Sequence, residues 1–166
     1  MENISAADRA EQYFKKGFNC SQAVFAAFAD RYGIDEKTAL QLSASFGGGF
    51  GRMREVCGCV SGMALVAGLE TGSFTENDSE GKAKNYQMMQ HLAEEYKKVS
   101  GGSIICKELL AMGNHRTGEI APGSEENSFQ PTKRTEEYYK KRPCVQLVRE
   151  ACTIIEREIF GGRNNE

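Results

Sequence analysis

The chain has 166 residues, of which 40% are hydrophobic and 27% are charged, as in an ordinary globular protein. This length suits a single domain over residues 1–166 with a real hydrophobic core. The net charge of −2 is not basic enough to suggest a nucleic acid as the main partner, and it is not acidic enough to suggest a disordered chain.

The roles expected for the cysteines depend on the cellular compartment of the protein. The N-terminal residues show no basic segment followed by an apolar run, so we expect no secretory signal. The longest apolar stretch, residues 59–69, is about half as long as a membrane span, so we expect a cytoplasmic protein. In a reducing cytosol, the six cysteines are expected to be core residues, metal ligands or redox-active thiols rather than structural disulfides.

Apolar residues at helical spacing, with no strand pattern, predict an all-α bundle of about six or seven helices. The expected helices cover residues 4–17, 20–32, 35–45, 59–69, 80–99, 104–112 and 143–160. Gly17 and Gly33 end the first two helices. Asn19, with Gln22 three residues later, forms the capping-box pattern that starts the second helix.

Several local features follow from the same pattern. Leu42 is expected on the inner face of the third helix, and Tyr86 on the inner stripe of the fifth. The small residues of the helix over 59–69 would permit close packing against its neighbours. Residues 113–131 are predicted to form a long surface loop, and the basic and aromatic run over 132–142 is predicted to be a solvated face.

Four of the six cysteines fall at the predicted starts of helices. Cys20 follows the Asn19 cap, Cys57 precedes the helix over 59–69, Cys106 lies three residues after a predicted Ser103 cap, and Cys144 follows Pro143. A helix start presents free N–H groups and the positive end of the dipole, which stabilise a thiolate and lower the cysteine pKa. The thiolate also binds soft metals and iron–sulfur clusters. We therefore predict Cys20, Cys57, Cys106 and Cys144 as metal ligands.

The two remaining cysteines have other expected roles. Cys152 lies in the middle of the last helix, where a cysteine packs as a small hydrophobic residue. Cys59 forms a C-x-C pair with Cys57, a weak signal for chelation or redox activity. Several cations lie near the helix-start cysteines in the sequence and could further favour the thiolate: Arg52, Arg54, Lys107, Lys141 and Arg142.

The glycine-rich run over 47–51 is the other motif of interest. No GK[ST] follows it and no strand precedes it, so it is neither a P-loop nor a dinucleotide-binding turn. We expect it to bring the backbone close to Cys57, where N–H groups could bond a thiolate or a sulfide, and we predict Gly49, Gly51 and Gly58 as cofactor-binding residues. Neither His91 nor His115 has a second ligand at metal-binding spacing.

Four motifs in order give the sequence a family resemblance: FNCSQAV at 18–24, GGGFGRMREVCGCVSG at 47–62, GSIICKELL at 102–110 and RPCVQLV at 142–148. The chain resembles the C_GCAxxG_C_C family of redox-active, four-cysteine proteins. The resemblance implies that the signature cysteines are Cys20, Cys57, Cys106 and Cys144. In the CGAxxG element of that family, Cys59 replaces the usual alanine, which favours a packing role for it.

A further implication concerns the cofactor. A related arrangement occurs beside haem-binding segments in split-Soret-type cytochromes, where a two-iron cluster has been proposed. The present chain has no C-x-x-C-H motif, so covalent haem attachment is not expected.

Three functions remain open from the sequence. The four cysteines could hold an iron–sulfur cluster, most plausibly [2Fe–2S], for electron transfer to an unidentified redox protein partner. They could instead cycle between dithiol and disulfide, with Cys57 or Cys106 as the catalytic, attacking thiolate, or form a structural zinc site. We favour the cluster, because thiol exchange usually needs only two cysteines. A homodimer is left open.

Overall fold

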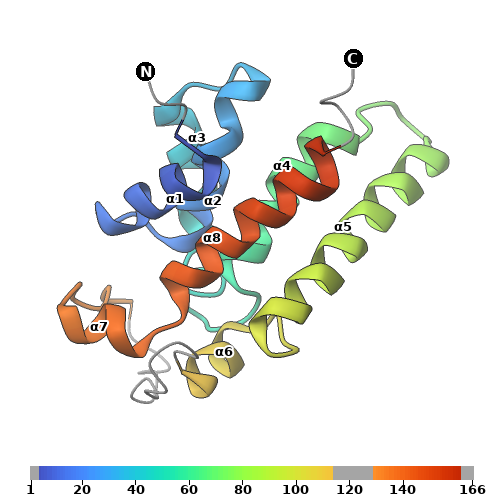
Figure 1. Cartoon of the computed structure of the whole chain (residues 1–166). Helices are drawn as coiled ribbons and strands as arrows, with labels where there is room; N and C mark the ends of the chain where they lie inside the picture. The colour runs from blue at the N-terminus through green and yellow to red at the C-terminus, as the bar shows by residue number, and fades with distance from the viewer. Residues whose placement is uncertain (1–3, 114–128, 162–166) are drawn as a thin grey trace.

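The computed structural model describes residues 4–113 and 129–161 and consists of helices joined by loops (Figure 1). The helices are α1 (Ala6–Lys15), α2 (Cys20–Ala29), α3 (Glu36–Ser43), α4 (Gly58–Thr71), α5 (Ser79–Ser100), α6 (Cys106–Met112), α7 (Glu136–Lys141) and α8 (Cys144–Ile155). Short 3₁₀ turns follow α2 and α3, and a π-helical turn extends α8. The described residues contain no strand, only one antiparallel bridge between Val56 and Ile105. The all-α prediction is confirmed.

Side-chain caps explain where several helices begin. The Asn19 carboxamide accepts from the Gln22 backbone N–H, and the Gln22 side chain accepts from the Asn19 N–H, both at 3.0 Å. The predicted capping box is therefore confirmed. The prediction that Ser103 caps the sixth helix is wrong, because α6 begins at Cys106 and the Ser103 hydroxyl instead accepts from the N–H of Ile105 at 3.0 Å.

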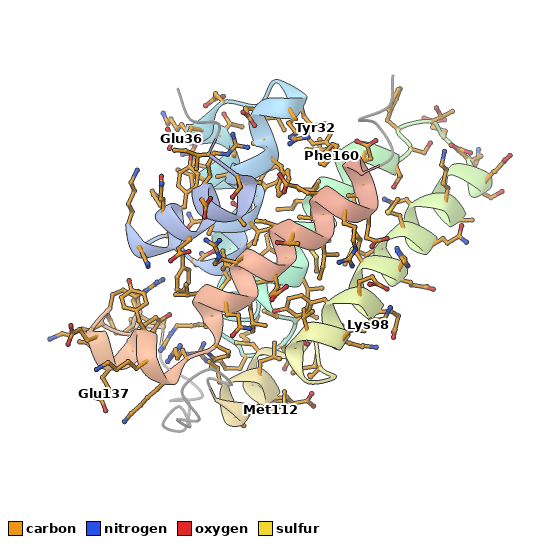
Figure 2. The ribbon with its side chains drawn as sticks, in the orientation of Figure 1. Tyr32, Glu36, Lys98, Met112, Glu137 and Phe160 are labelled. Carbon is orange, nitrogen blue, oxygen red and sulfur yellow. The ribbon has the colours of Figure 1, made fainter. Side chains whose placement is uncertain are left out.

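Helices α2 and α8 lie at the centre of the bundle. Helix α2 packs against α1, α3, α4 and α8, and α5 packs along α4 and α8 (Figure 1). Helices α6 and α7 lie at the end of the molecule where α8 begins. Figure 2 shows Met112 and Glu137 at that end and Tyr32 beside Phe160 at the other, where their rings are 6.5 Å apart. No helix in the described part of the chain is both long and apolar enough to span a bilayer.

The small residues of α4 allow it to pack closely against α2. A Cβ atom added at Gly62 would lie 2.8 Å from Cβ of Val24, which is nearer than real Cβ atoms approach. The predicted close packing of this helix is therefore found in the structure, and it fixes the separation of the two helices.

Residues 132–142 are not simply a solvated face, as the sequence predicted. They include α7, which is capped by the Thr135 hydroxyl. The rings of Tyr138 and Tyr139 lie 6.4 and 6.2 Å from the ring of Phe14. The Arg134 guanidinium lies 4.2 Å above the same ring and donates to the carbonyl oxygen of Phe14. Aromatic and cation–π packing thus places this segment against α1.

Two predicted core positions are wrong. Leu42 is 54% exposed, because α3 turns Ala39 and Ser43 inward and the Ser43 hydroxyl donates to the Ala39 carbonyl at 2.7 Å. Tyr86 is 61% exposed, because the buried residues of α5 lie toward its C-terminal end. The predicted surface loop over 113–131 falls mainly on residues 114–128, which lie outside the described residues, as do residues 162–166.

The α2–α4 contact gives a stability prediction. Substituting Gly62→Ala should lower the free energy of unfolding by about 1–3 kcal/mol, because the new methyl group overpacks the contact with Val24. Gly68→Ala in the same helix is the matched control, since a Cβ there meets nothing within 4 Å, and it should raise stability by about 0.5–1 kcal/mol. Urea unfolding measures both. Equal effects of the two substitutions would show that the contact is not tight.

Candidate redox site

A cavity of about 330 Å³ lies among the starts of four helices. Five of the six cysteines line it: Cys20, Cys57, Cys59, Cys106 and Cys144. Cys20, Cys106 and Cys144 are the first residues of α2, α6 and α8, and Cys57 immediately precedes α4. The structure therefore brings all four predicted ligands to one cavity and adds Cys59 to them.

Backbone hydrogen bonds join two of these helix starts directly. The N–H of Cys57 donates to the carbonyl of Ile104 at 2.8 Å, and the N–H of Cys106 donates to the carbonyl of Glu55 at 2.6 Å. These bonds flank the Val56–Ile105 bridge. Cys57 and Cys106 are consequently held in register although they are far apart in the sequence.

The glycine-rich loop before α4 winds in a left-handed sense. Residues with positive φ are Gly48, Gly49, Phe50, Gly51, Arg52 and Arg54. The N–H groups of Arg54 and Glu55 donate to the carbonyls of Gly48 and Gly49 at 3.1 and 2.9 Å. Non-glycine residues adopt this conformation at a cost, and such strain clusters at functional sites.

The predicted cofactor-binding glycines, Gly49, Gly51 and Gly58, all line the cavity. A Cβ at Gly49 would lie 2.6 Å from Cβ of Cys106, and one at Gly58 would lie 3.1 Å from Cβ of Cys20. Gly49 and Gly58 therefore let the backbone pass against two of the cysteines, whereas a Cβ at Gly51 would make only ordinary contacts, the nearest at 3.8 Å.

Contacts among the sulfur atoms favour the thiolate at two cysteines. Hydrogen bonds from Cys144 and then Cys59 hold the pKa of Cys20 well below its usual value, and burial opposes this only in part. The pKa of Cys57 is also lowered, first by a hydrogen bond from Cys59. The hydroxyl of buried Tyr96, 3.3 Å from Sγ of Cys57, lowers it further.

The other thiols of the cavity show the opposite shift. Burial, together with the nearby charge of Cys57, raises the pKa of Cys106 to about 11, against the attraction of Arg54. The hydrogen bond to Cys20 raises the pKa of Cys144 well above its usual value, and burial does the same for Cys59. The prediction that a helix start lowers the cysteine pKa is therefore wrong for Cys106 and Cys144, because desolvation and neighbouring thiolates outweigh the helix start.

Four arginines complete the lining: Arg52, Arg54, Arg134 and Arg142. None of the described residues that line the cavity is Asp or Glu. The sequence indicated three of these arginines by their nearness to cysteines but missed Arg134. It also missed Tyr96, which helical spacing marked only as a core residue, so no signal in the sequence connected it with Cys57.

The remaining candidates lie away from the cavity. Cys152 is fully buried in the core of α8, where the sequence placed it. His91 lies 2.6 Å from a carboxylate oxygen of Glu158, and His115 is outside the described residues. All six cysteines are free thiols in the structure. Within residues 4–113 and 129–161, no group of three or more His, Cys, Asp or Glu side chains is arranged so that it could hold a metal ion.

These features define an all-α protein with a cysteine- and arginine-lined cavity built from helix starts. The chain belongs to the family described as "Putative redox-active protein (C_GCAxxG_C_C)", whose sequence model matches residues 18–158. That range contains every cysteine of the cavity, and it confirms the resemblance noted in the sequence. No curated protein and no solved structure is similar enough to the chain to match it.

The glycine loop gives a prediction with an internal control. Gly49→Ala and Gly51→Ala both force an alanine into a left-handed conformation, which costs about 1–2 kcal/mol. Only Gly49→Ala also drives a methyl group into Cys106, so it should destabilise the fold by about 1–3 kcal/mol more. Denaturant unfolding compares the two. Equal destabilisation would mean that Cys106 is not held against this loop.

Proposed function

We propose that the protein is a one-electron carrier in which Cys20, Cys57, Cys106 and Cys144 hold a [2Fe–2S] cluster. The observation that carries this proposal is the convergence of these four thiols on one cavity that arginines line. Membership of a family described as redox-active supports a redox role for the same residues. The electron partner would be another redox protein.

The residues of the cavity fit such a group. Thiolates are the usual ligands of iron–sulfur clusters, and the cavity of about 330 Å³ offers more room than a single ion needs. When bound, a [2Fe–2S] cluster supplies reversible transfer of one electron.

The residues of the chain would hold and shield this group. The hydroxyl of Tyr96 contacts Cys57, and the thiol of Cys59 hydrogen-bonds to Cys20 and Cys57. Such contacts to ligand sulfurs fix their positions and tune the redox potential. Cys57 and Cys106 are buried, so water has little access to that side of the cavity.

A thiol–disulfide function is the second candidate, and the behaviour of one pair of cysteines favours it. Cys20 and Cys144 line the same cavity, and each thiol shifts the pKa of the other in the opposite direction. In that reaction, this dithiol would pass two electrons and two protons to a disulfide of a partner protein. Cys20 and Cys144 would become a disulfide, and the partner would become a dithiol.

The first function predicts that protein purified without oxygen is coloured and contains about two irons per chain. Cys106→Ser should lose the visible absorbance and most of the iron, because a hydroxyl is a poor ligand for iron in such a cluster. Cys152→Ala is the matched control and should retain both, since Cys152 lies in the core away from the cavity. Iron analysis and absorbance spectra provide the measurements. A colourless, iron-free wild-type protein would reject the function.

The second function predicts a reversible pairing of thiols in metal-free protein. A mild disulfide oxidant should remove the thiols of Cys20 and Cys144 together, and dithiothreitol should restore them, because the two residues line one cavity and each thiol shifts the pKa of the other. Alkylation followed by mass spectrometry identifies the pair. If all six thiols survive the oxidant, this second function is excluded.

A further inference from the structure

Arg54 is a buried cation whose hydrogen-bonding capacity is only partly used. The residue is 4% exposed, and its Nε and Nη2 atoms are buried without a hydrogen-bond partner. Its Nη1 atom lies 3.8 Å from Sγ of Cys106. Leaving such donors unpaired in the interior is costly, and buried charges are normally paired.

The backbone fixes Arg54 in this position. Its φ of 62° places it in the left-handed region, its N–H donates to the carbonyl of Gly48 at 3.1 Å, and its carbonyl accepts from the N–H of Lys107 at 3.2 Å. These backbone bonds hold Arg54 beside the start of α6, where its side chain is buried. The guanidinium is therefore kept next to Cys106, with two of its nitrogen atoms unpaired.

The other arginines of the cavity are engaged differently. Arg134 donates to the carbonyls of Phe14 and Phe18, and Arg142 lies 4.6 Å from the ring centre of Tyr138. Arg52 donates to the hydroxyl of Thr132 at 2.8 Å. Arg54 is thus the lining arginine whose guanidinium has unpaired buried donors and lies against the sulfur of a cavity cysteine.

We propose that Arg54 is a positioning residue whose buried guanidinium, held beside Sγ of Cys106, stabilises the reduced cluster and raises its reduction potential. This inference rests on the proposed function. A [2Fe–2S] cluster with four thiolates is a dianion when oxidised and a trianion when reduced. A fixed guanidinium therefore stabilises the reduced state more than the oxidised one.

The electron balance of the reduction is simple. A one-electron donor, dithionite in the test below, converts one ferric ion to ferrous. No bond is formed or broken and no proton is transferred, so the added negative charge stays in the cavity. Arg54 compensates that charge without moving.

The test compares wild type with Arg54→Met, Arg54→Lys and a control, Arg157→Met. Arg157 is an exposed residue of the π-helical turn that follows α8, and it pairs with Glu95 and Glu158. In a dithionite titration, Arg54→Met should lower the ratio of reduced to oxidised cluster at a fixed potential at least tenfold, which is about 59 mV for one electron. Arg54→Lys, which keeps the charge but not the planar donors, should show a smaller shift. Arg157→Met should show none.

A second readout distinguishes this role from a structural one. In metal-free protein, Arg54→Met removes an unpaired buried charge, so its thermal midpoint should equal or exceed that of metal-free wild type. In loaded protein, the same variant should have a lower midpoint than wild type. If Arg54→Met fails to fold or is less stable without metal, the guanidinium supports the fold itself, and the inference is wrong.

The two proposals fail in different ways. A wild-type protein that takes up no iron would reject the proposed function. A wild type and an Arg54→Met variant that load equally and share one potential would overturn only the inference about Arg54.

Discussion

The short backbone pairing between residues 54–57 and 104–107 is the constraint on which the site depends. Hydrogen bonds from Cys57 to Ile104, from Cys106 to Glu55 and from Lys107 to Arg54 join the loop before α4 to the start of α6. This pairing, together with the buried side chains of Leu109 and Leu110, holds the short helix α6 against the rest of the bundle. The pairing also fixes Arg54, so one local interaction places two sulfurs and a cation together.

Opposing electrostatic effects in the cavity lower the pKa of some cysteines and raise the pKa of others. Helix starts and arginines favour thiolates, whereas desolvation favours neutral thiols. Crowding then makes one thiol a hydrogen-bond donor to the next, which lowers the pKa of Cys20 and raises that of Cys144. A bound metal centre would remove this distinction, because coordination takes the proton from each ligand.

Much of the fold and part of the site could be predicted from the sequence. Helical periodicity and caps such as Asn19 are local signals, and they located seven helices and the four cysteines at helix starts. Helix α7 was missed because its six residues are too few for periodicity, and its place depends on Tyr138 and Arg134 meeting Phe14. The burial of Arg54 and the contact of Tyr96 with Cys57 arise only from tertiary packing, so no local pattern could reveal them.

The tight approach of Gly62 to Val24 has a consequence for the proposed electron transfer. The two helices that meet there begin at or beside Cys20 and Cys57, and a contact without slack makes them behave as one rigid body. Atoms held in this way shift little when the charge between them changes. The scaffold therefore favours a small reorganisation energy, so that an electron entering the cavity would meet a polar environment already arranged for it.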